Sequence, residues 1–501
     1  MSDMTARGRA ARTGRPSSSD QTLEQMSQQL TQLSRFMHSA EAARLVLGLL
    51  YLSRIPRDAA RPGVPTWAWL VNHATENPSE VRRAVIECLA HWLPSIEDPD
   101  TGAMRLVPEL PASSTRHLPA LIHAIGSIEQ VSPLLDKCLR DLSAAQADGS
   151  NYFTPCDLAR LMVGAAVPQD GNSVLDPVCG SGGLLVESHR YVHERVGLNP
   201  TMFLQGKEQH APSSQVAHMN LAVRGIRGHI FPPGNSLAQP EPKRHDIVLA
   251  NLPFNQSAWA PDGDAEPGYG RPPLRSVTAA DPRWSEEPPP RGSANAAWIQ
   301  HIVHALAPAG RAVFLMADSM AISRQSAPRR LRERLLHADL VECVIALPPR
   351  VFGPSKATAC LWVLNKDKRA RPGWGSSDRR GQALFINARR AYERVPDSRS
   401  RRLGKENTAR ILTTLAAWRG LSESGAAAMG YSDVPGWSQS CSTKEITSHE
   451  YSLMPTSYAV EPLSPERDTR SQIERLKFEL TDRLAQMHDL ELRLLDALEE
   501  I

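Results

Sequence analysis

Nine residues in the middle of the chain, Ile247-Val248-Leu249-Ala250-Asn251-Leu252-Pro253-Phe254-Asn255, indicate the kind of domain the sequence encodes. They open with a short apolar run that contains a β-branched pair, a pattern typical of a buried strand. The strand would end at the tetrapeptide Asn251–Phe254. In open α/β sheets, ligands bind at the carboxyl ends of the strands, so we expect this tetrapeptide to face a site.

The residue types of the tetrapeptide suit a planar base that carries an amino group. The Asn251 side chain and a backbone carbonyl can each accept a hydrogen bond from an exocyclic NH2 group. Pro253 holds its own φ at about −65° and leaves a carbonyl pointing outward, and Phe254 offers a flat face for stacking. Enzymes that act on a base flip it out of the helix and read it in this way. An ordinary turn at a strand end has the same appearance, so both interpretations stay open at this point.

A glycine-rich turn precedes this strand in the segment Ser173–Glu187, which predicts a strand, a turn and a helix. Glycine allows positive φ and a close approach of ligand to backbone. The phosphate fingerprint G-x-G-x-x-G is absent, and an acidic residue, Asp176, ends the strand instead. An acidic residue suits a ligand with amine and hydroxyl groups, such as S-adenosylmethionine, better than a pyrophosphate. The alternative is a βα turn without a ligand.

Two further strand ends follow at the spacing of βα units. Met202–Glu208 predicts a second strand, and an acidic residue at its end, Glu208, is placed to bind ribose hydroxyls. A helix around Val216–Leu221, a short strand near His229–Phe231 and the turn Gly234–Leu237 complete the series. Chance rarely produces a glycine turn, an acidic strand end, an Asn turn and Asn-Leu-Pro-Phe at this regular spacing.

The alternation of helices and strands continues beyond the tetrapeptide. Helices are predicted at Ala294–Leu306 and Pro328–His337, and strands at Ala312–Met316, Leu340–Leu347 and, as the last strand, Thr358–Leu364. This pattern predicts an α/β fold with a doubly wound sheet. Residues 256–292, rich in Pro, Gly, Asp and Arg, are expected to form a long exposed loop, which beside a site is often functional.

The length of 501 residues predicts about two to four domains. Residues 1–25 have the composition of a disordered tail, and residues 26–147 carry helical periodicity and no visible catalytic residue. Residues 148–395 form the α/β domain in this division, and residues 396–465 a helical and loop extension. Thr154 and Pro155 are expected as the N-cap and first residue of a helix, Cys156–Val167.

Residues 466–501 predict a C-terminal coiled-coil helix, because apolar residues recur every seven positions over four heptads. One apolar series is Ile473, Leu480, Met487, Leu494 and Ile501, and the second is Leu476, Leu490 and Ala497, with Arg483 as its one misfit. An amphipathic helix that packs on its own domain is the alternative.

Charge and cysteine content limit the functional classes. The net charge of +3 gives no basic character to the whole chain, but residues 366–402 contain 12 Lys or Arg against 4 Asp or Glu. This excess indicates either a nucleic-acid patch or an Arg-rich solvated loop. Seven cysteines without paired spacing indicate reduced thiols in a cytoplasmic protein, with no disulfide frame and no metal site. No apolar run reaches the ~18 residues of a membrane span, and no signal core is present.

In combination, the motifs resemble the modification subunit of type I restriction–modification systems, a family of adenine-specific DNA methyltransferases. The resemblance covers residues 35–460, and the helical Leu47–Leu52 fits that family's N-terminal domain. The matching motifs are Tyr152–Pro155, Leu175–Pro177 with Cys179–Gly183, Gly206 with Glu208, Ala250-Asn251 with Pro253–Asn255, Gln300–Ile302, Ala346–Pro349 with Phe352, Phe385–Arg389, and Tyr451 with Leu453, Pro455 and Tyr458.

The resemblance implies the fold and chemistry of an S-adenosylmethionine-dependent methyltransferase. It implies that the target adenine is bound by Asn251, Pro253 and Phe254, and that its amino group attacks the cofactor methyl directly, without a metal or covalent intermediate. The cofactor-binding residues that it implies are Asn151, Tyr152, Phe153, Thr154, Pro155, Cys156, Asp176, Gly180, Ser181, Gly182, Gly183, Glu208 and Asn235. Two positions depart from the family pattern, which usually has Pro at Leu252 and Asp at Asn235.

The same resemblance implies DNA and a separate specificity subunit as partners. Only 67 residues lie between Gly183 and Asn251, and the sheet elements fill them, so no room is left for a target-recognition domain. An assembly of two copies of this chain with one specificity subunit is implied, and a restriction subunit is a further partner that the sequence does not decide. Two other functions remain open: a catalytically weak scaffold, and a methyltransferase of protein glutamine amides.

Overall fold

The computed structural model describes residues 37–461 except for 57–61, 94–95, 99–101, 105–109, 129–130, 146–153, 198–199, 257–258, 260–280, 285–286, 291, 352–357, 397 and 422–429, together with residues 28, 35 and 476–477. The predicted tail, the cofactor candidates Asn151–Phe153, the motif residue Phe352 and, except for Leu476 and Lys477, the heptad segment lie outside the described residues.

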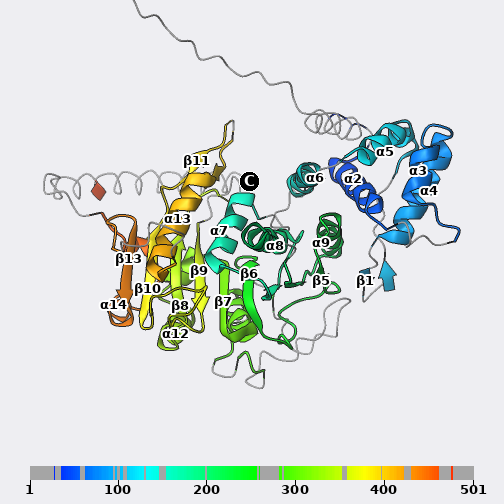
Figure 1. The fold of residues 1–501 in the computed structure, drawn as a ribbon. Coiled ribbons are helices and arrows are strands. Elements are labelled where there is room, and N and C mark those ends of the chain that lie inside the picture. The colour runs from blue at the N-terminus through cyan, green and yellow to red at the C-terminus, as the bar shows by residue number, and fades with distance from the viewer. Residues whose placement is uncertain are drawn as a thin grey trace, which may run out of the picture.

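A nine-stranded sheet forms the centre of the molecule (Figure 1). In sheet order the strands are β13 (Ser438–Ser442), β10 (Gln382–Asn387), β8 (Val341–Ala346), β9 (Ala359–Asn365), β7 (Leu306–Ala317), β6 (His245–Asn251), β3 (Ser173–Asp176), β4 (Phe203–Gly206) and β5 (Gly228–Ile230). The central strand predicted from Ile247 is β6, where all but one of the seven residues are buried.

The sheet is mixed, because two of its strands run against their neighbours. β9 pairs antiparallel with both β7 and β8, and β13 pairs antiparallel with β10. The prediction of Thr358–Leu364 as the last strand is wrong, since β10 and β13 follow it in the chain and add two strands to the sheet beyond β8. β13 is a short run of Ser, Gln and Cys, so it lacks the apolar pattern that identified the others.

β7 begins earlier than predicted, at Leu306, and includes the Pro-Ala-Gly turn expected before it. Its pairing with β6 passes from His245↔Leu306 directly to Ile247↔Arg311. Residues 307–310 therefore bulge out of the ladder, as a Pro-Gly segment requires, before the regular strand begins.

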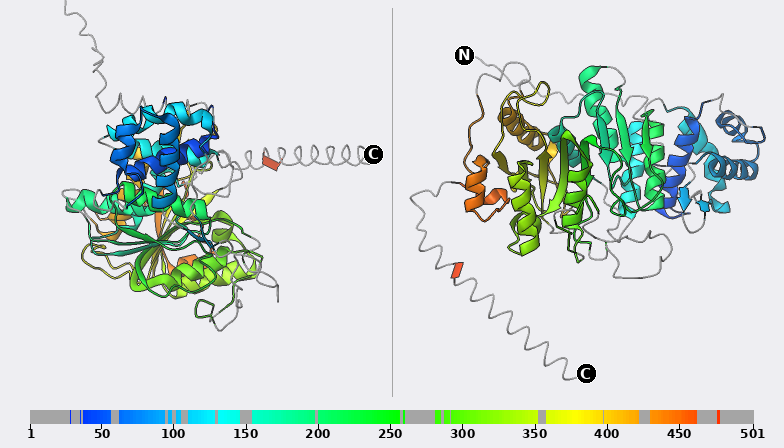
Figure 2. Two further views of the ribbon diagram at one scale, coloured as in Figure 1. Left: turned by 90° about the vertical axis from the view of Figure 1, so that its right-hand side faces the viewer. Right: turned by 90° about the horizontal axis from the view of Figure 1, so that it is seen from below.

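Helices cover both faces of the sheet, which confirms the predicted doubly wound α/β fold (Figure 2). Alternate residues of each strand enter opposite cores, as in Ile247 and Leu249 on one face and Val248 and Ala250 on the other. The first face is covered by α7 (Cys156–Ala166), α8 (Gly183–Val196), α9 (Ala211–Val223) and α13 (Gly404–Arg419). The second is covered by α10 (Asn295–Ala305), α11 (Asp318–Ile322), α12 (Ser326–His337) and α14 (Thr443–Ser448).

The N-terminal part is mainly helical, with a small two-stranded sheet. Its elements are α2 (Ser39–Ser53), α3 (Trp67–His73), α4 (Pro78–Trp92), β1 (Ile96–Asp98), β2 (Gly102–Met104), η2 (Ala112–His117), α5 (Leu118–Gly126) and α6 (Ser132–Ala145). Their common core continues into one face of α9 through Val216, Met219 and Val223, so α9 joins the helical part to the sheet. The division at residues 147 and 148 stays a prediction. No described helix has the length and hydropathy that crossing a membrane requires.

A buried ionic cluster holds α7 against the sheet. Glu342 is fully buried among Arg311, Arg379 and Arg419, with ion-pair distances of 2.9 to 3.5 Å. Arg311 and Arg419 also donate to the carbonyls of Ala166 and Ala165 at 3.0 and 2.7 Å. These carbonyls end α7 and have no partner within the helix. The carboxyl end of α7 is thereby fixed at the amino edge of the sheet, where the parallel strands begin. The amino end of α7 reaches the carboxyl edge, where β6 and the other parallel strands end.

Candidate active site at the carboxyl edge of the sheet

Asn251 is the last residue of β6, and only 5% of it is exposed. Its side-chain Nδ2 donates a hydrogen bond to Thr154 Oγ1 at 3.1 Å. Its Oδ1 is buried and accepts no hydrogen bond from the described residues. Buried polar atoms almost always have a partner, so an isolated acceptor calls for an explanation. The arrangement holds the amide in place through its nitrogen, and no described residue donates to its oxygen.

The prediction that Thr154 is an N-cap is wrong. α7 begins at Cys156 with Pro155 as its N-cap, and no side chain caps it. The Pro155 carbonyl accepts the first helical bond, from Ala159 N at 2.9 Å. The Thr154 hydroxyl accepts from Asn251 instead, because the amino end of α7 lies over the end of β6.

The remaining residues of the tetrapeptide differ in burial. Leu252 is 1% exposed and packs in the core of the second face, whereas Phe254 is half-buried against the core of the first face. Pro253 is half-buried. Asn255 adopts a left-handed φ of 57°.

Asn295, the first residue of α10, supports this turn. Its Oδ1 accepts from Asn255 N at 3.0 Å, and its Nδ2 donates to Asn255 Oδ1 at 2.8 Å. The buried side chain therefore clamps the chain directly after Phe254. Sequence reasoning missed Asn295, because nothing in its neighbourhood distinguishes it from an ordinary helix-start residue.

The glycine turn between β3 and α8 uses positive φ at Gly180 and Gly182, 53° and 79°. A Cβ at Gly182 would lie 3.4 Å from the Cβ of Ala217 on α9, so the turn also packs closely on a helix. Ser181 is held from that helix, since its carbonyl accepts a hydrogen bond from Asn220 Nδ2 at 2.8 Å.

Asn220 is in turn fixed by the helical N-terminal part. Arg224 Nε donates to Asn220 Oδ1 at 2.9 Å, and the same guanidinium pairs with Asp136 on α6. A chain of polar contacts thus runs from α6 to the carbonyl of Ser181. Asn220 was not predicted, because its partners are remote in the sequence.

Glu208 lies two residues beyond β4 and bonds both to the glycine turn and to its own segment. Its Oε2 accepts from Gly180 N at 2.9 Å and its Oε1 from His210 N at 2.8 Å. Each carboxylate oxygen has capacity for a further bond, so these contacts orient the group toward a ligand without saturating it. At the end of β4, a Cβ on Gly206 would lie 2.7 Å from the Ile230 side chain and 2.9 Å from the Cys179 sulfur, so a larger residue there would require these side chains to move.

Asp176, the last residue of β3, is 1% exposed. Burial raises the pKa of its carboxyl to about 8, a hydrogen bond from Val178 N at 3.0 Å opposes this shift, and the Glu208 carboxylate adds to it. No basic side chain of the described residues pairs with this buried carboxyl, so a cation placed beside it would favour the ionised form.

Asn235 forms the turn that follows β5. Its Oδ1 accepts from Leu237 N at 2.9 Å, an Asx-type turn that an aspartate would also make. The next residue, Ser236, donates to the carbonyl of Pro177 at 2.6 Å and so ties this turn to the end of β3. The departure from Asp at Asn235 therefore keeps the turn geometry.

The sheet topology brings these groups to one edge. β6, β3 and β4 are neighbouring parallel strands, with Leu175 opposite Val248 and Asp176 opposite Gly206. Asn251, Asp176 and Glu208 consequently lie at successive carboxyl ends, where α/β folds bind ligands. This edge can hold a cationic cofactor with hydroxyl groups next to a base with an amino group.

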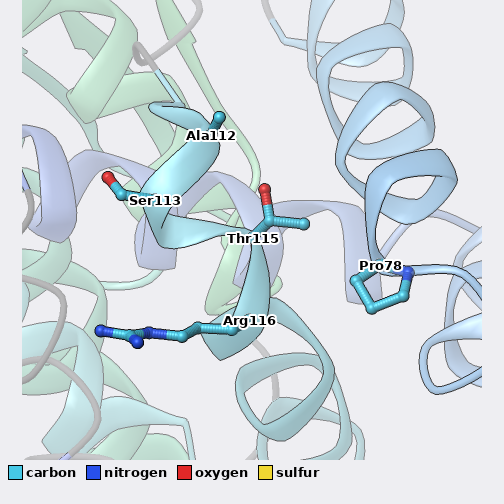
Figure 3. Close-up of a pocket in the computed structure, with 5 residues that line it drawn as sticks. All are labelled: Pro78, Ala112, Ser113, Thr115 and Arg116. Atoms are coloured by element: carbon cyan, nitrogen blue, oxygen red, sulfur yellow. The ribbon is translucent and has the colours of Figure 1, made fainter.

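A separate small pocket lies in the N-terminal part (Figure 3). Pro78, at the start of α4, and four residues of η2 line it: Ala112, Ser113, Thr115 and Arg116. None of the predicted site residues lines it, so this pocket is not the site at the edge of the sheet.

Comparison with known proteins identifies the family of the chain. Residues 131–466 match the model of the N-6 DNA Methylase family. The methylase subunit of the type I restriction enzyme HindI of Haemophilus influenzae is 33% identical over 321 residues, 63% of this chain and 65% of that protein. The MjaVII methylase subunit of Methanocaldococcus jannaschii is 30% identical over 332 residues, 65% of this chain and 52% of that protein. The chain thus spans about half to two thirds of the length of these relatives.

Solved structures show the same fold at low sequence identity. The type I restriction–modification methyltransferase subunit of Streptococcus thermophilus superposes with a TM-score of 0.64 at 16% identity, over 88% of this chain and 99% of that one. A chain from a structural study of type I R-M complex assembly gives 0.65 at 17% identity, over 96% and 99%. With the family model covering most of the chain, including both glycine turn and tetrapeptide, the protein belongs to the N-6 DNA methylase family.

Proposed function

We propose that this protein transfers the methyl group of S-adenosylmethionine to the 6-amino group of adenine in DNA, in the cytoplasm, as the modification subunit of a type I-like restriction–modification or phage-defence system. The observation that carries the proposal is the acceptor Asn251 Oδ1, which is buried at the end of β6 beside the glycine turn and has no hydrogen-bond partner among the described residues. Family membership supports the same chemistry and disfavours the scaffold and the glutamine methyltransferase.

Asn251 would bind the target amine through that free oxygen. The adenine amino group donates one hydrogen bond to Asn251 Oδ1 and a second to the carbonyl of Leu252 or Pro253. Both hydrogen bonds increase the electron density on the amino nitrogen and therefore its nucleophilicity toward the methyl group. Phe254 would supply the stacking face, worth ~1–3 kcal/mol per base. Thr154 and Asn295 act as positioning residues on either side of this segment.

The cofactor would occupy the edge formed by β3 and β4. The buried Asp176 carboxylate suits the ammonium of S-adenosylmethionine, and Glu208 suits its ribose hydroxyls. The positive-φ turn at Gly180 and Gly182 brings the backbone close to the ligand. When bound, the cofactor supplies the electrophilic methyl, and the chain's task is to hold it in line with the amine.

DNA sequence would be read by a specificity subunit. The described part of the chain between the glycine turn and Asn251 consists of sheet elements and their helices, which leaves no recognition domain there. The C-terminal heptads are the proposed dock for that subunit. Two copies of this chain with one specificity subunit, and a restriction subunit in the full assembly, complete the proposal.

The variant Asn251→Ala tests the proposed function. It removes the acceptor but leaves the glycine turn intact, so methyl transfer should be lost while S-adenosylmethionine binding stays within about 3-fold. The measurement is transfer of labelled methyl to DNA by the full chain with its specificity subunit, combined with calorimetric cofactor binding.

The matched control is Asn255→Gly, which removes another asparagine side chain from the same turn. Glycine tolerates the left-handed φ of 57° at this position, and the backbone N–H keeps its bond to Asn295 Oδ1. Methyl transfer should therefore fall less in this control than in Asn251→Ala. Undiminished transfer by Asn251→Ala would refute the assignment.

A further inference from the structure

The basic segment Lys366–Arg402 is divided between the amino edge of the sheet, where the parallel strands begin, and the carboxyl edge, where they end. β9 is antiparallel to its neighbours and ends at Asn365, opposite the start of the regular part of β7. Residues 366–381 therefore lie at the amino edge, away from Asn251. β10 is parallel to β8 and ends at Asn387, so residues 388–402 lie at the carboxyl edge, where Asn251 lies.

The basic residues of the half at the amino edge make ion pairs and hydrogen bonds within the fold. Every basic residue there except Lys366 pairs with an acidic side chain, and Lys366 Nζ donates to the carbonyl of Leu306 at 2.8 Å. The pairs are Lys368–Asp339, Arg369–Asp367, Arg371–Asp367, Arg379–Glu342 and Arg380–Asp378. This half is a structural network and offers no excess charge to a ligand.

The half at the carboxyl edge forms a hairpin beside the candidate site. β11 (Glu393–Arg394) pairs antiparallel with β12 (Arg401–Arg402), and we name the described residues 390–396 and 398–402 the basic hairpin. Figure 1 shows β11 beside the end of α13. Arg401 N donates to the carbonyl of Arg350, in the segment after β8, at 3.0 Å.

A second contact ties the hairpin to the helix that follows Thr154. Gly404, directly after the hairpin, donates from its N to Asp157 Oδ2 in the first turn of α7 at 3.2 Å. Because Thr154 lies just before α7 and bonds to Asn251, the hairpin is held next to the place proposed for the target base.

The charge of the basic hairpin is largely uncompensated. Residues 390–402 contain five arginines against two acidic residues in the sequence. Arg394 and Arg399 are exposed and pair with no acidic side chain of the described residues. Arg390 and Arg402 pair with Glu461 and Glu393 at 3.4 and 2.7 Å, but these arginines are 89% and 62% exposed, so the pairs are weak and exchangeable.

We propose that the basic hairpin binds the phosphate backbone of the duplex from which the target adenine is taken. The inference rests on the proposed function, because a base that enters beside Asn251 brings its flanking phosphates to the same edge. Arginine contacts to phosphates position a protein on DNA without reading sequence. Charge complementarity selects DNA as the occupant, and an acidic surface of a partner protein is the competing outcome of the test.

The test compares two double variants of the full chain. Arg394→Gln with Arg399→Gln removes two charges from the basic hairpin. Arg369→Gln with Arg380→Gln removes two exposed charges, 65% and 64% accessible, from the opposite edge and serves as the matched control. Binding to a fluorescent duplex of about 30 base pairs, long enough to span the edge, is measured by anisotropy from low to moderate salt, where non-specific affinity depends on the number of phosphate contacts.

In the hairpin variant, the plot of log K for DNA binding against log salt should become less steep by about 2, since each lost phosphate contact reduces the steepness by about 0.9. Binding at ~0.1 M salt should weaken about 10- to 60-fold. The control should keep the slope of the intact protein. Equal losses in both variants, or no duplex binding by the intact chain at low salt, would overturn the proposal. So would an unchanged slope combined with lost co-purification of the specificity subunit, which would identify an acidic protein surface as the occupant.

Methyl transfer keeps this inference distinct from the proposed function. If the intact chain with its specificity subunit methylates DNA while the hairpin variant retains its salt slope, only the hairpin assignment fails. If the intact assembly binds DNA with the expected slopes but transfers no methyl group, the proposed function fails and the hairpin assignment stands. Unchanged cofactor binding in both variants verifies that they are folded.

Discussion

Replacing Asp176 with Asn should stabilise the fold and impair cofactor binding at the same time. The carboxyl group is 1% exposed, and burial raises its pKa from 3.8 to about 8. An asparagine is neutral at every pH and keeps an oxygen that can accept the hydrogen bond from Val178 N. The substitution therefore removes the titration with little change in shape.

The sign and size follow from linkage between protonation and folding. Because the folded-state pKa lies above the unfolded value, the stability contributed by the protonated carboxyl is fully present below pH 3.8 and is lost as the pH rises toward 8. Between these limits the free energy of unfolding falls by about 1.4 kcal/mol per pH unit from this group. From pH 5 to pH 7 the loss is therefore roughly 2.7 kcal/mol.

The assay is urea unfolding of the intact protein and of Asp176→Asn at pH 5, 6 and 7. Other titrating groups are common to both proteins and cancel in the difference, so the gain in the free energy of unfolding of the variant should grow with pH by the amount above. Calorimetry in two buffers of different ionisation enthalpy gives the second measurement. The cofactor ammonium favours the ionised carboxyl, so binding to the intact protein should release a proton near pH 6, and binding to the variant should be weaker without release.

A stability difference that is independent of pH would refute this reasoning, since it would mean that Asp176 is already ionised in the free protein. Proton release by the variant equal to that of the intact protein would assign the titration to another group. Either result would remove the argument that the buried carboxyl is prepared for a cationic ligand.

Two further substitutions test the surroundings of the site. Asn220→Ala should weaken S-adenosylmethionine binding about 2- to 10-fold in calorimetry, because the lost hydrogen bond to the Ser181 carbonyl is worth ~0.5–1.5 kcal/mol. Binding equal to that of the intact protein would show that the glycine turn keeps its shape without this hydrogen bond. Leu252→Pro should lower the free energy of unfolding, measured in urea, by roughly 1 kcal/mol, because the smaller proline ring replaces a fully buried leucine and each buried CH2 is worth ~0.8 kcal/mol. Methyl transfer per folded molecule should be kept or raised, and a loss of transfer at unchanged stability would contradict both expectations.

Local patterns in the sequence were sufficient for the elements that carry the candidate site. The apolar run of β6, the glycine turn after β3 and the acidic residues Asp176 and Glu208 were identified because strand periodicity and turn chemistry depend on neighbouring residues only. The prediction of neighbouring strand ends also followed, since consecutive βα units place parallel strands at one edge. By the same reasoning β13 was missed, because its polar sequence becomes a strand through pairing with β10.

The tertiary structure alone decided how those elements cooperate. The partner of Asn251, Thr154, lies 97 residues away in the sequence, so no local rule could distinguish its role from that of an N-cap. The basic segment 366–402 reads as one patch in the sequence, but the reversed direction of β9 and the return of β10 send its two halves to opposite edges of the sheet. Hydrogen bonds and charges act over a few ångströms of space, and spatial distance is set by strand order and direction, which residue composition does not specify.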